Sequence, residues 1–469
     1  MRRTLLLITL LFPLSLFASS FSFYVPTENQ HLVYRSVAIK NISEAPQQLQ
    51  QINFSPLPPD IELCTAGSSC LAKYQNTCTT NHVLAPGTDC LLWFRAKASA
   101  KVSVAKDQKL TIHIVNAQQE SIAQTFRLAA HSEVFAAGDF TQPTNHIARW
   151  DGQRWLPLGK GLTGTSAQSL VEYDGDVVAG GDFNQAGTKD VNFLARWNGQ
   201  AWQPLRGGVA DPGPSALTVY HDALFVGGGF DQVDGNVAAH YLAAFQDDQW
   251  IGFKTGLDFP IISLANAGEN LYFAGDFHEP ALQVGLWRNN HVEPLGAGVD
   301  DVVFSLAATA NNTVYAGGAF SASGATKLNH IGQWDCQQWL PLGDGLDDEV
   351  YALAIDDNKL YAGGRFDRSG TQPLSAIARW DGHNWYALAG GVTRRVNPSF
   401  TTVYSIASAN DDVFVGGYFN QANNIDATIT ANSIAQWQNS TQTWRALGNG
   451  LNDTVRSIVI VPVLDVSNF

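Results

Sequence analysis

The most regular pattern along the chain is a short apolar segment that ends in small residues and is followed by phenylalanine. Two small residues, one variable residue and Phe occur in this order seven times between residues 134 and 419. The second small residue is always glycine, at Gly138, Gly181, Gly228, Gly275, Gly318, Gly364 and Gly417. Successive copies are 43 to 53 residues apart. A period of this length, filled with short apolar segments, predicts seven similar structural units.

Residues 350–391 show the pattern within one unit. Four apolar or aromatic segments follow one another, at residues 350–353, 360–366, 377–380 and 385–388. Asp381 and Gly382 join the last two segments, and this dipeptide suits a tight hairpin turn. Because no stretch of useful length has the 3.6-residue period of a helix, each unit is predicted to be four strands with almost no helix.

A small residue followed by Leu or Ile marks the first strand of each unit. The seven pairs are Ser169-Leu170, Ala216-Leu217, Ser263-Leu264, Ser305-Leu306, Ala352-Leu353, Ser405-Ile406 and Ser457-Ile458. Because the last pair follows the seventh unit, residues 455–460 are predicted to pair beside residues 134–140 and to complete the first unit. Small side chains at all seven positions suit innermost strands that converge on a narrow axis, where larger side chains would clash.

The double glycine and the Trp-Asp-Gly sequence resemble the kelch-type repeat. They are similar to the kelch-like repeats of secreted bacterial proteins and of fungal cortical polarity markers. The resemblance covers about residues 128–469 and implies an all-β fold with a seven-bladed β-propeller. Three units depart from the pattern. Ala137 and Phe273-Ala274 replace the first glycine region in the first and fourth units, Phe245 replaces the first Trp in the third, and Val292 replaces the second Trp in the fourth. The resemblance does not fix a function, because such propellers include both binding modules and enzymes.

Residues 21–127 lack the repeat and are predicted to form a separate domain. Residues 37–43 and 109–115 alternate between apolar and polar side chains, as half-buried strands do. The size of this segment suits an immunoglobulin-like β-sandwich. The stretch between Cys78 and Cys90, with Leu84-Ala85-Pro86-Gly87 inside it, resembles a motif of hydin-like immunoglobulin domains and implies the same sandwich.

Four of the five cysteines lie in this first domain. We expect disulfides between Cys64 and Cys70 and between Cys78 and Cys90, although two other connectivities are open. A zinc site is the alternative, but the spacings lack a close Cys-x-x-Cys pair. Cys336 takes the glycine position of a Trp-Asp-Gly turn, and we expect it to be a free thiol at the surface.

The first residues indicate export. Arg2 and Arg3 precede an apolar run at residues 5–17, and small residues follow at 18–20. Residues 1–20 are therefore predicted to be a signal peptide, which places the protein in the periplasm or outside the cell. A membrane anchor is the alternative, but the run is short for a bilayer span, and no membrane insertion is expected.

The charge balance bears on partners. Asp and Glu number 42 against 28 Lys and Arg, giving a net charge of −14. Because nucleic acids and anionic membranes attract basic surfaces, neither is expected as a partner. We expect a monomer without a metal or another cofactor.

The residue between Gly and Phe varies while its neighbours repeat, which is typical of a binding position on a constant scaffold. It should lie at one opening of the channel, where the loops before the first strands also emerge. The candidate ligand-binding rim comprises Asp139, Asp182, Asp276, Arg365 and Tyr418, with Asp300, Asp301, Asp347, Asp348, Arg394 and Arg395 from those loops. In the alternative interpretation these residues are solvated turns, and Asp139 and Asp182 pair with Arg149 and Arg196 on the adjacent strand.

The usual catalytic patterns of propellers and hydrolases are missing. The sequence contains no sialidase Asp-box, no Gly-x-Ser-x-Gly and no His-Glu-x-x-His, and Cys336 is predicted on the face opposite to that of a galactose-oxidase-like copper site. The leading hypothesis is therefore a non-catalytic module that recognises a protein or a glycan through the acidic face. The alternative is an extracellular polysaccharide-active enzyme that uses two rim carboxylates as acid and base.

Overall fold

The computed structural model of the chain describes residues 21–24, 34–57, 61–64, 77–96, 108–116, 121–356, 359–409 and 411–468. These residues form an all-β structure with many antiparallel sheets. They include one short 3₁₀ turn, η1 (Pro398–Phe400), and no α-helix, which confirms the expectation of almost no helix. Accordingly, the described part contains no helix that is long and apolar enough to cross a membrane. The predicted signal peptide lies outside the described residues.

The N-terminal part consists of two sheets around one apolar core. One sheet has the order β1 (Phe21–Tyr24), β2 (Tyr34–Asn41), β6 (Asp89–Ala96) and β4 (Ile61–Leu63). The other contains β5 (Val83–Leu84), β3 (Gln47–Phe54) and β7 (Gln108–Asn116), and continues into β8 (Ser121–Gly138). Alternate residues of these strands, such as Ile39, Leu92 and Ile112, are fully or almost fully buried between the sheets.

The remainder of the described chain contains seven four-stranded antiparallel units. The first three are β45 (Val455–Asn468), β8, β9 (Ile147–Trp150) and β10 (Trp155–Pro157); β11 (Leu162–Tyr173), β12 (Asp176–Ala186), β14 (Leu194–Trp197) and β15 (Trp202–Pro204); and β16 (Pro214–Tyr220), β17 (Ala223–Gly228), β20 (Tyr241–Gln246) and β21 (Gln249–Lys254). The fourth and fifth are β22 (Ile261–Ala267), β23 (Asn270–Gly275), β24 (Val284–Arg288) and β25 (His291–Pro294); and β26 (Val303–Ala308), β27 (Val314–Gly318), β30 (Ile331–Trp334) and β31 (Trp339–Pro341). The last two are β32 (Val350–Asp356), β33 (Lys359–Gly364), β36 (Ile377–Trp380) and β37 (Trp385–Ala387); and β39 (Thr402–Ala409), β40 (Asp412–Tyr418), β43 (Ile434–Gln438) and β44 (Thr443–Ala446).

Short strands decorate the connections between these units. They are β13 (Lys189–Asp190), β18 (Gln232–Val233), β19 (Val237–Ala238), β28 (Ala322–Ser323), β29 (Thr326–Lys327), β34 (Arg368–Ser369), β35 (Gln372–Pro373), β38 (Val392–Thr393), β41 (Gln421–Asn423) and β42 (Thr428–Thr430).

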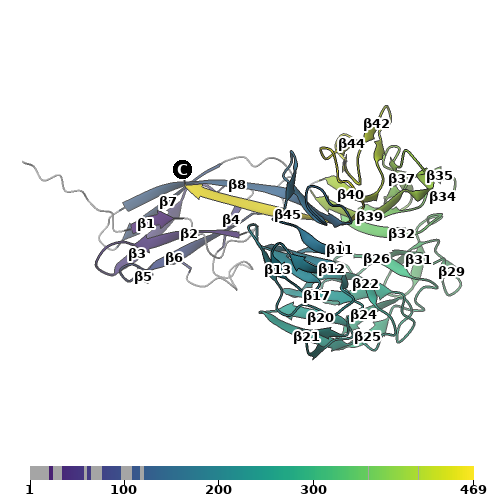
Figure 1. The fold of residues 1–469 in the computed structure, drawn as a ribbon, viewed down its shortest axis with the longest axis horizontal. Coiled ribbons are helices and arrows are strands. Elements are labelled where there is room, and N and C mark those ends of the chain that lie inside the picture. Colours follow the sequence, from purple (N-terminus) through teal and green to yellow (C-terminus); the bar gives the residue numbers. More distant parts are fainter. Residues whose placement is uncertain are drawn as a thin grey trace, which may run out of the picture.

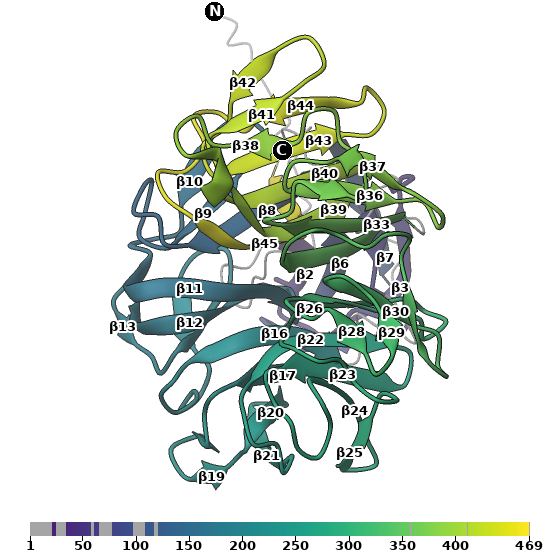
Figure 2. The same ribbon diagram turned by 90° about the vertical axis from the view of Figure 1, so that its right-hand side faces the viewer.

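The first strand of each unit lies towards the centre of the group, and we call these seven the inner strands. They are β11, β16, β22, β26, β32, β39 and β45. Each inner strand contacts the next in this order, and β45 contacts β11, so that the contacts close on themselves. Figure 2 shows β11, β16, β22, β26, β39 and β45 near the centre, with β10, β21, β25, β37 and β44 further out.

The glycine that defines the repeat packs against the backbone of the inner strand. A Cβ atom on Gly138, Gly318 or Gly364 would lie 2.1 Å from the carbonyl oxygen of the residue just before the inner strand. This distance is far below van der Waals contact, so no side chain fits at these positions. The repeated glycine is thus explained by a close backbone approach inside every unit.

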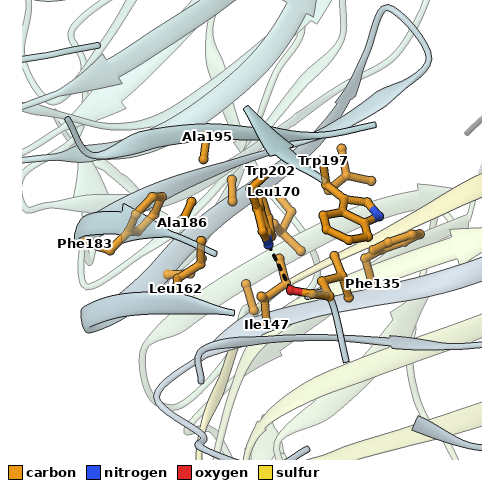
Figure 3. Close-up of a cluster of buried hydrophobic side chains, with 14 of the residues drawn as sticks. Phe135, Ile147, Leu162, Leu170, Phe183, Ala186, Ala195, Trp197 and Trp202 are labelled. Carbon is orange, nitrogen blue, oxygen red and sulfur yellow. Dashed lines mark hydrogen bonds between the residues drawn. The ribbon is translucent and has the colours of Figure 1, made fainter. Parts of the chain in front are cut away.

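Aromatic side chains link each unit to the preceding one. In the second unit the indole Nε1 of Trp202 donates to the carbonyl oxygen of Leu158 in the first unit, at 2.9 Å, as Figure 3 shows. The Trp197 ring lies 5.5 Å from the Trp202 ring and lies beside Gly159, where a Cβ atom would be at an ordinary contact distance of 3.5 Å from the ring. The apolar cluster of Figure 3 therefore spans both units, from Phe135 to Phe183.

Two long strands join the N-terminal part to the seven units. β8 pairs with β7 over its first half and with β9 over its second half, and β45 pairs with β8 from Val455–Gly138 to Asn468–Phe126. Figure 1 shows this pair running from one part of the molecule into the other. The expected pairing of residues 455–460 beside β8 is present. It continues into the N-terminal part, where residues 461–468 pair with residues 126–133.

The cysteines follow the expected pattern where the structure describes them. Cys78 and Cys90 form a disulfide. The expected bond between Cys64 and Cys70 involves residue 70, which lies outside the described residues. Cys336 is an exposed free thiol between β30 and β31, as predicted. Its φ of 75° is positive, like those of the glycines at the equivalent positions.

Candidate functional site

Every inner strand contains an irregularity at the same place. The register with the second strand skips one residue immediately before the repeated small residue, for example between Val350 and Ala352 and between Val455 and Ser457. One inner-strand residue per unit is therefore released from regular pairing, as in a β-bulge. These seven bulge residues are Gln168, Ser215, Ile262, Phe304, Tyr351, Tyr404 and Arg456.

The bulge residues are accessible although the residue before each of them is buried. Val350 and Ala352 are buried, whereas Tyr351 between them is half-buried. The contacts of the seven inner strands close on themselves around a central axis. Because each bulge lies near the start of its inner strand, the seven bulge residues lie around one end of this axis. They form a ring of variable side chains on a constant backbone.

Three consecutive bulge residues form a continuous aromatic surface, which we call the aromatic arc: Phe304, Tyr351 and Tyr404. The rings of Phe304 and Tyr351 are stacked, with centroids 4.8 Å apart and planes inclined by 20°. The Tyr351 and Tyr404 centroids are 5.3 Å apart, with an inclination of 61°. The Cζ atom of Arg456 lies 5.6 Å from the Tyr404 centroid and continues the arc.

A carboxylate and a guanidinium border the arc at two places, at its middle ring and beyond Tyr404. The Tyr351 hydroxyl donates to Glu349 Oε2 at 2.5 Å, and Arg365 Nη1 donates to the same oxygen at 3.2 Å. Burial and the hydrogen bond to Glu349 together raise the pKa of Tyr351 to about 12, so the hydroxyl stays protonated. Beyond Tyr404, Arg456 binds both oxygens of Asp139, at 2.7 and 2.8 Å.

A long loop borders the arc beside Tyr404. Tyr404 follows Leu388 by 16 positions, whereas Tyr351 follows Leu342, at the equivalent place, by nine. The extra residues include Val396 and Phe400, which are 66% and 57% exposed. Such exposed apolar side chains, gathered on one side of the axis, are typical of a contact surface.

The long loop also carries Arg394 and Arg395. The Arg394 guanidinium lies 3.7 Å from the centre of the Tyr418 ring, in a cation–π contact. The backbone N–H of Arg394 donates to Thr401 Oγ1 and that of Arg395 donates to Asn420 Oδ1. Of the residues predicted for the rim, Asp139, Arg365, Tyr418, Arg394 and Arg395 thus belong to the units that also carry Tyr351, Tyr404 and Arg456.

Other predicted rim residues hold turns together. Asp300 accepts hydrogen bonds from the backbone of Ser321 and Ala322 and from the Ser321 hydroxyl. Asp347 accepts from the backbone of residues 367 and 368 in the same manner. Asp301 and Asp348 each accept the N–H of the following residue, and Asp276 is exposed.

The alternative in which Asp139 pairs with Arg149 is wrong. Arg149 Nη1 donates to both carboxylate oxygens of Glu133, at 2.6 and 2.7 Å. Arg149 lies opposite Phe135 in the register of β8 and β9, and Glu133 is the diagonal neighbour on the same face of the sheet. Asp139 is four residues beyond Phe135, about 13 Å further along an extended strand, and is therefore out of reach of Arg149.

The proposed pair of Asp182 and Arg196 is wrong for the same reason. Arg196 lies opposite Val178, and its Nε donates to Asp176, the diagonal neighbour, at 2.7 Å. Asp176 is 1% exposed, so this ion pair is internal. Asp182 instead accepts a hydrogen bond from the Thr165 hydroxyl.

None of the seven bulge residues is among the residues predicted from the sequence, although the sequence carries a signal for them. Each directly precedes the repeated Ser or Ala, and the residue types range from Ser215 to Arg456 while their neighbours stay the same. This is the same contrast that singled out the residue between Gly and Phe. The remaining bulge residues, Gln168, Ser215 and Ile262, form the side of the ring without aromatic rings.

Hollows lie between neighbouring units, and two of them contain the repeated tryptophan pair. A hollow of about 520 Å³ lies between the first and seventh units and is lined by Trp150 and Trp155. Another of about 470 Å³ lies between the fifth and sixth units and is lined by Trp380 and Trp385. Both are built from the repeated tryptophan pair and therefore belong to the packing of the scaffold.

Comparison with known proteins assigns no family. No protein-family model matches the chain, and no curated protein matches it either. The computationally designed Ika8 protein is similar, with 18% identity, a TM-score of 0.41 and coverage of 73% of this chain and 93% of that protein. Apo AztD from Citrobacter koseri is similar with 9% identity, a TM-score of 0.31 and coverage of 77% and 97%. Likenesses this weak indicate neither a family nor an activity.

Proposed function

We propose that the protein is an exported, non-catalytic binding module that recognises a protein or a glycan at the aromatic arc. The observation that carries this proposal is the arc itself, three adjacent aromatic side chains held half-exposed at one end of the axis. Aromatic side chains in such positions offer flat apolar faces together with hydroxyl groups, which suits recognition rather than packing.

The scaffold of this proposal is a seven-bladed β-propeller preceded by an immunoglobulin-like sandwich. Seven four-stranded antiparallel units, and inner strands whose contacts close on themselves, support the propeller. Two sheets around one core support the sandwich. The disulfide between Cys78 and Cys90 supports location outside the cytoplasm, because reducing compartments keep thiols free.

The state of the carboxylates near the arc favours binding over catalysis. A general acid needs a carboxyl group that stays protonated near neutral pH, usually in an apolar setting without a cation beside it. Asp139 is bound by both nitrogens of Arg456, and Glu349 lies 3.2 Å from Arg365. Each carboxylate therefore has a cation directly beside it, unlike the apolar setting of a general acid.

The test compares the mature protein with variants on opposite sides of the ring. Tyr351→Ala combined with Tyr404→Ala removes the centre of the arc, and Gln168→Ala combined with Ile262→Ala is the matched control. Binding is measured on an array of oligosaccharides and against purified secreted proteins. We expect the arc variant to lose at least about tenfold in affinity, equivalent to about 1.4 kcal/mol, while the control binds like the parent.

Two results would contradict this function. Equal loss in both double variants would show that the arc does not form the binding surface. Release of reducing sugars from a polysaccharide, abolished by Asp139→Asn or Glu349→Gln, would establish the enzyme instead. Thermal unfolding of all variants shows whether each loss reflects the surface or the fold.

A further inference from the structure

The surroundings of the aromatic arc are rich in arginine, although the chain as a whole is acidic. The net charge is −14, yet the arc and its long loop carry four arginines: Arg365, Arg394, Arg395 and Arg456. Arg365 and Arg456 are compensated by Glu349 and Asp139. The contacts that the described residues give Arg394 and Arg395 include no carboxylate, so these two arginines are the ones best placed to bind an anion.

Arg394 is held in an orientation that leaves its donors available. Its guanidinium covers the face of the Tyr418 ring at 3.7 Å, and a planar guanidinium lying over a ring keeps its N–H groups at the edge. Two backbone hydrogen bonds, to Thr401 and Asn420, fix the segment of the loop that carries both arginines. Part of the entropy that binding would otherwise cost is therefore already lost in the free protein.

We propose that the ligand is a saccharide chain that carries carboxylate groups, as in oligomers of uronic acids. Its sugar rings lie on Phe304, Tyr351 and Tyr404, and its carboxylates accept hydrogen bonds from Arg394 and Arg395. Guanidinium groups are well suited to this role, because their paired donors match the two oxygens of a carboxylate. This inference rests on the proposed function, since it assigns the ligand class of the same surface.

The surroundings of the arc favour a saccharide over an acidic peptide. The rings of Phe304 and Tyr351 are stacked on each other, so the apolar surface that they offer to the C–H face of a sugar ring consists of their outer face and edges. The ion pairs of Asp139 with Arg456 and of Glu349 with Arg365 place a donor and an acceptor side by side, one pair beyond Tyr404 and the other at Tyr351. A hydroxyl group both donates and accepts, so it satisfies both members of such a pair.

The experiment measures binding of the mature protein by calorimetry to oligomers of galacturonate, guluronate and glucuronate. Each oligomer is also tested after its carboxylates have been reduced to alcohols, which keeps the rings and removes the charge. Polyglutamate serves as the acidic peptide. We expect at least one acidic oligomer to bind, and its reduced form to bind at least about tenfold more weakly.

The variants identify the groups responsible. Arg394→Gln combined with Arg395→Gln should weaken binding of the acidic oligomer about tenfold and leave the reduced form unaffected. Arg154→Gln combined with Arg445→Gln, two exposed arginines in the outer strands and their turns, is the control and should bind like the parent. Affinity for the acidic oligomer should also fall as salt is raised, since exposed charges are screened.

The outcomes separate this inference from the function on which it rests. Reduced oligomers that bind as tightly as acidic ones, no binding of any of the three acids, or equal binding of polyglutamate would overturn the assignment of an acidic saccharide. If Tyr351→Ala with Tyr404→Ala still abolishes binding of a neutral glycan or a protein, the arc remains the binding surface. If an acidic oligomer binds independently of Tyr351 and Tyr404, the arc itself is refuted as the site.

Discussion

The hydroxyl oxygen of Ser457, on the last strand, accepts a hydrogen bond from the backbone N–H of Leu170 in the second unit, at 3.0 Å. The same bond joins four other pairs of neighbouring inner strands: Ser169 with Leu217, Ser263 with Leu306, Ser305 with Leu353, and Ser405 with Ile458. The repeated serine thus provides an acceptor between units as well as a small side chain. Ala216 and Ala352 take its place at the two remaining junctions.

Ser457→Ala should lower the free energy of unfolding by about 1–2 kcal/mol, because the N–H of Leu170 loses its partner. Ala352→Ser is the converse change and should raise the free energy of unfolding, since it supplies a hydroxyl acceptor for the backbone N–H of Ile406 on the neighbouring inner strand. Urea unfolding measures both, with the exposed Ser440→Ala as control. If Ser457→Ala behaves like Ser440→Ala, the hydrogen bond between the inner strands does not contribute to closure.

The sequence was sufficient for the repeated features of the fold and insufficient for features that depend on register. Glycine and tryptophan recur because every unit needs the same close approach and the same packing, so their spacing predicts the strands directly. The partner of Arg149 depends on the register of β8 and β9. Arg149 lies opposite Phe135, so its partner is the diagonal neighbour Glu133 and not Asp139. The arc depends on three of the seven bulges, which the sequence marks only through variable residues beside the repeated Ser or Ala.

The indole hydrogen bond between units predicts different costs for two neighbouring tryptophans. Trp202 Nε1 donates to Leu158, whereas Trp197 Nε1 is buried without a hydrogen-bond partner. Trp202→Phe and Trp197→Phe remove similar volumes from the same cluster. We expect the Trp202 variant to be less stable by about 1 kcal/mol, because it also leaves a carbonyl unsatisfied. Equal midpoints in urea would show that the volume alone matters.

The backbone at Cys336 predicts a stabilising substitution. Its φ of 75° lies in the left-handed region, where Gly152, Gly199 and Gly382 occupy the equivalent turn positions. A side chain costs about 1–2 kcal/mol in that conformation, and the extra entropy of an unfolded glycine offsets about 0.5–1 kcal/mol of any gain. Cys336→Gly should therefore raise the unfolding free energy by about 0.5–1 kcal/mol. Cys336→Ala removes the thiol but keeps Cβ, and a similar gain in that variant would contradict the explanation.

The turn held by Asp300 predicts how stability depends on pH. Burial alone would raise the pKa of Asp300, but the hydrogen bonds from Ser321 and Ala322 outweigh it and lower the pKa below its usual value of 3.8. A carboxyl group with a lowered folded-state pKa contributes stability above its unfolded pKa, and the contribution is lost as the pH falls through the folded value. The advantage of the parent over Asp300→Ala should therefore be full at pH 7 and shrink below about pH 4.

Asp300→Asn is the matched variant, because Asn452 occupies the equivalent turn and accepts two backbone N–H groups, from Thr141 and Gln142, at 2.9 and 3.1 Å. The asparagine at position 300 should still accept the N–H groups of Ser321 and Ala322. Asp300→Asn should therefore be more stable than Asp300→Ala by an amount that does not change with pH, since neither variant titrates at this position. Urea unfolding of the three proteins at several values between pH 3 and pH 7 measures both differences. A parent that keeps the same advantage over both variants at every pH would show that the carboxylate of Asp300 contributes no charge-dependent stability to the turn.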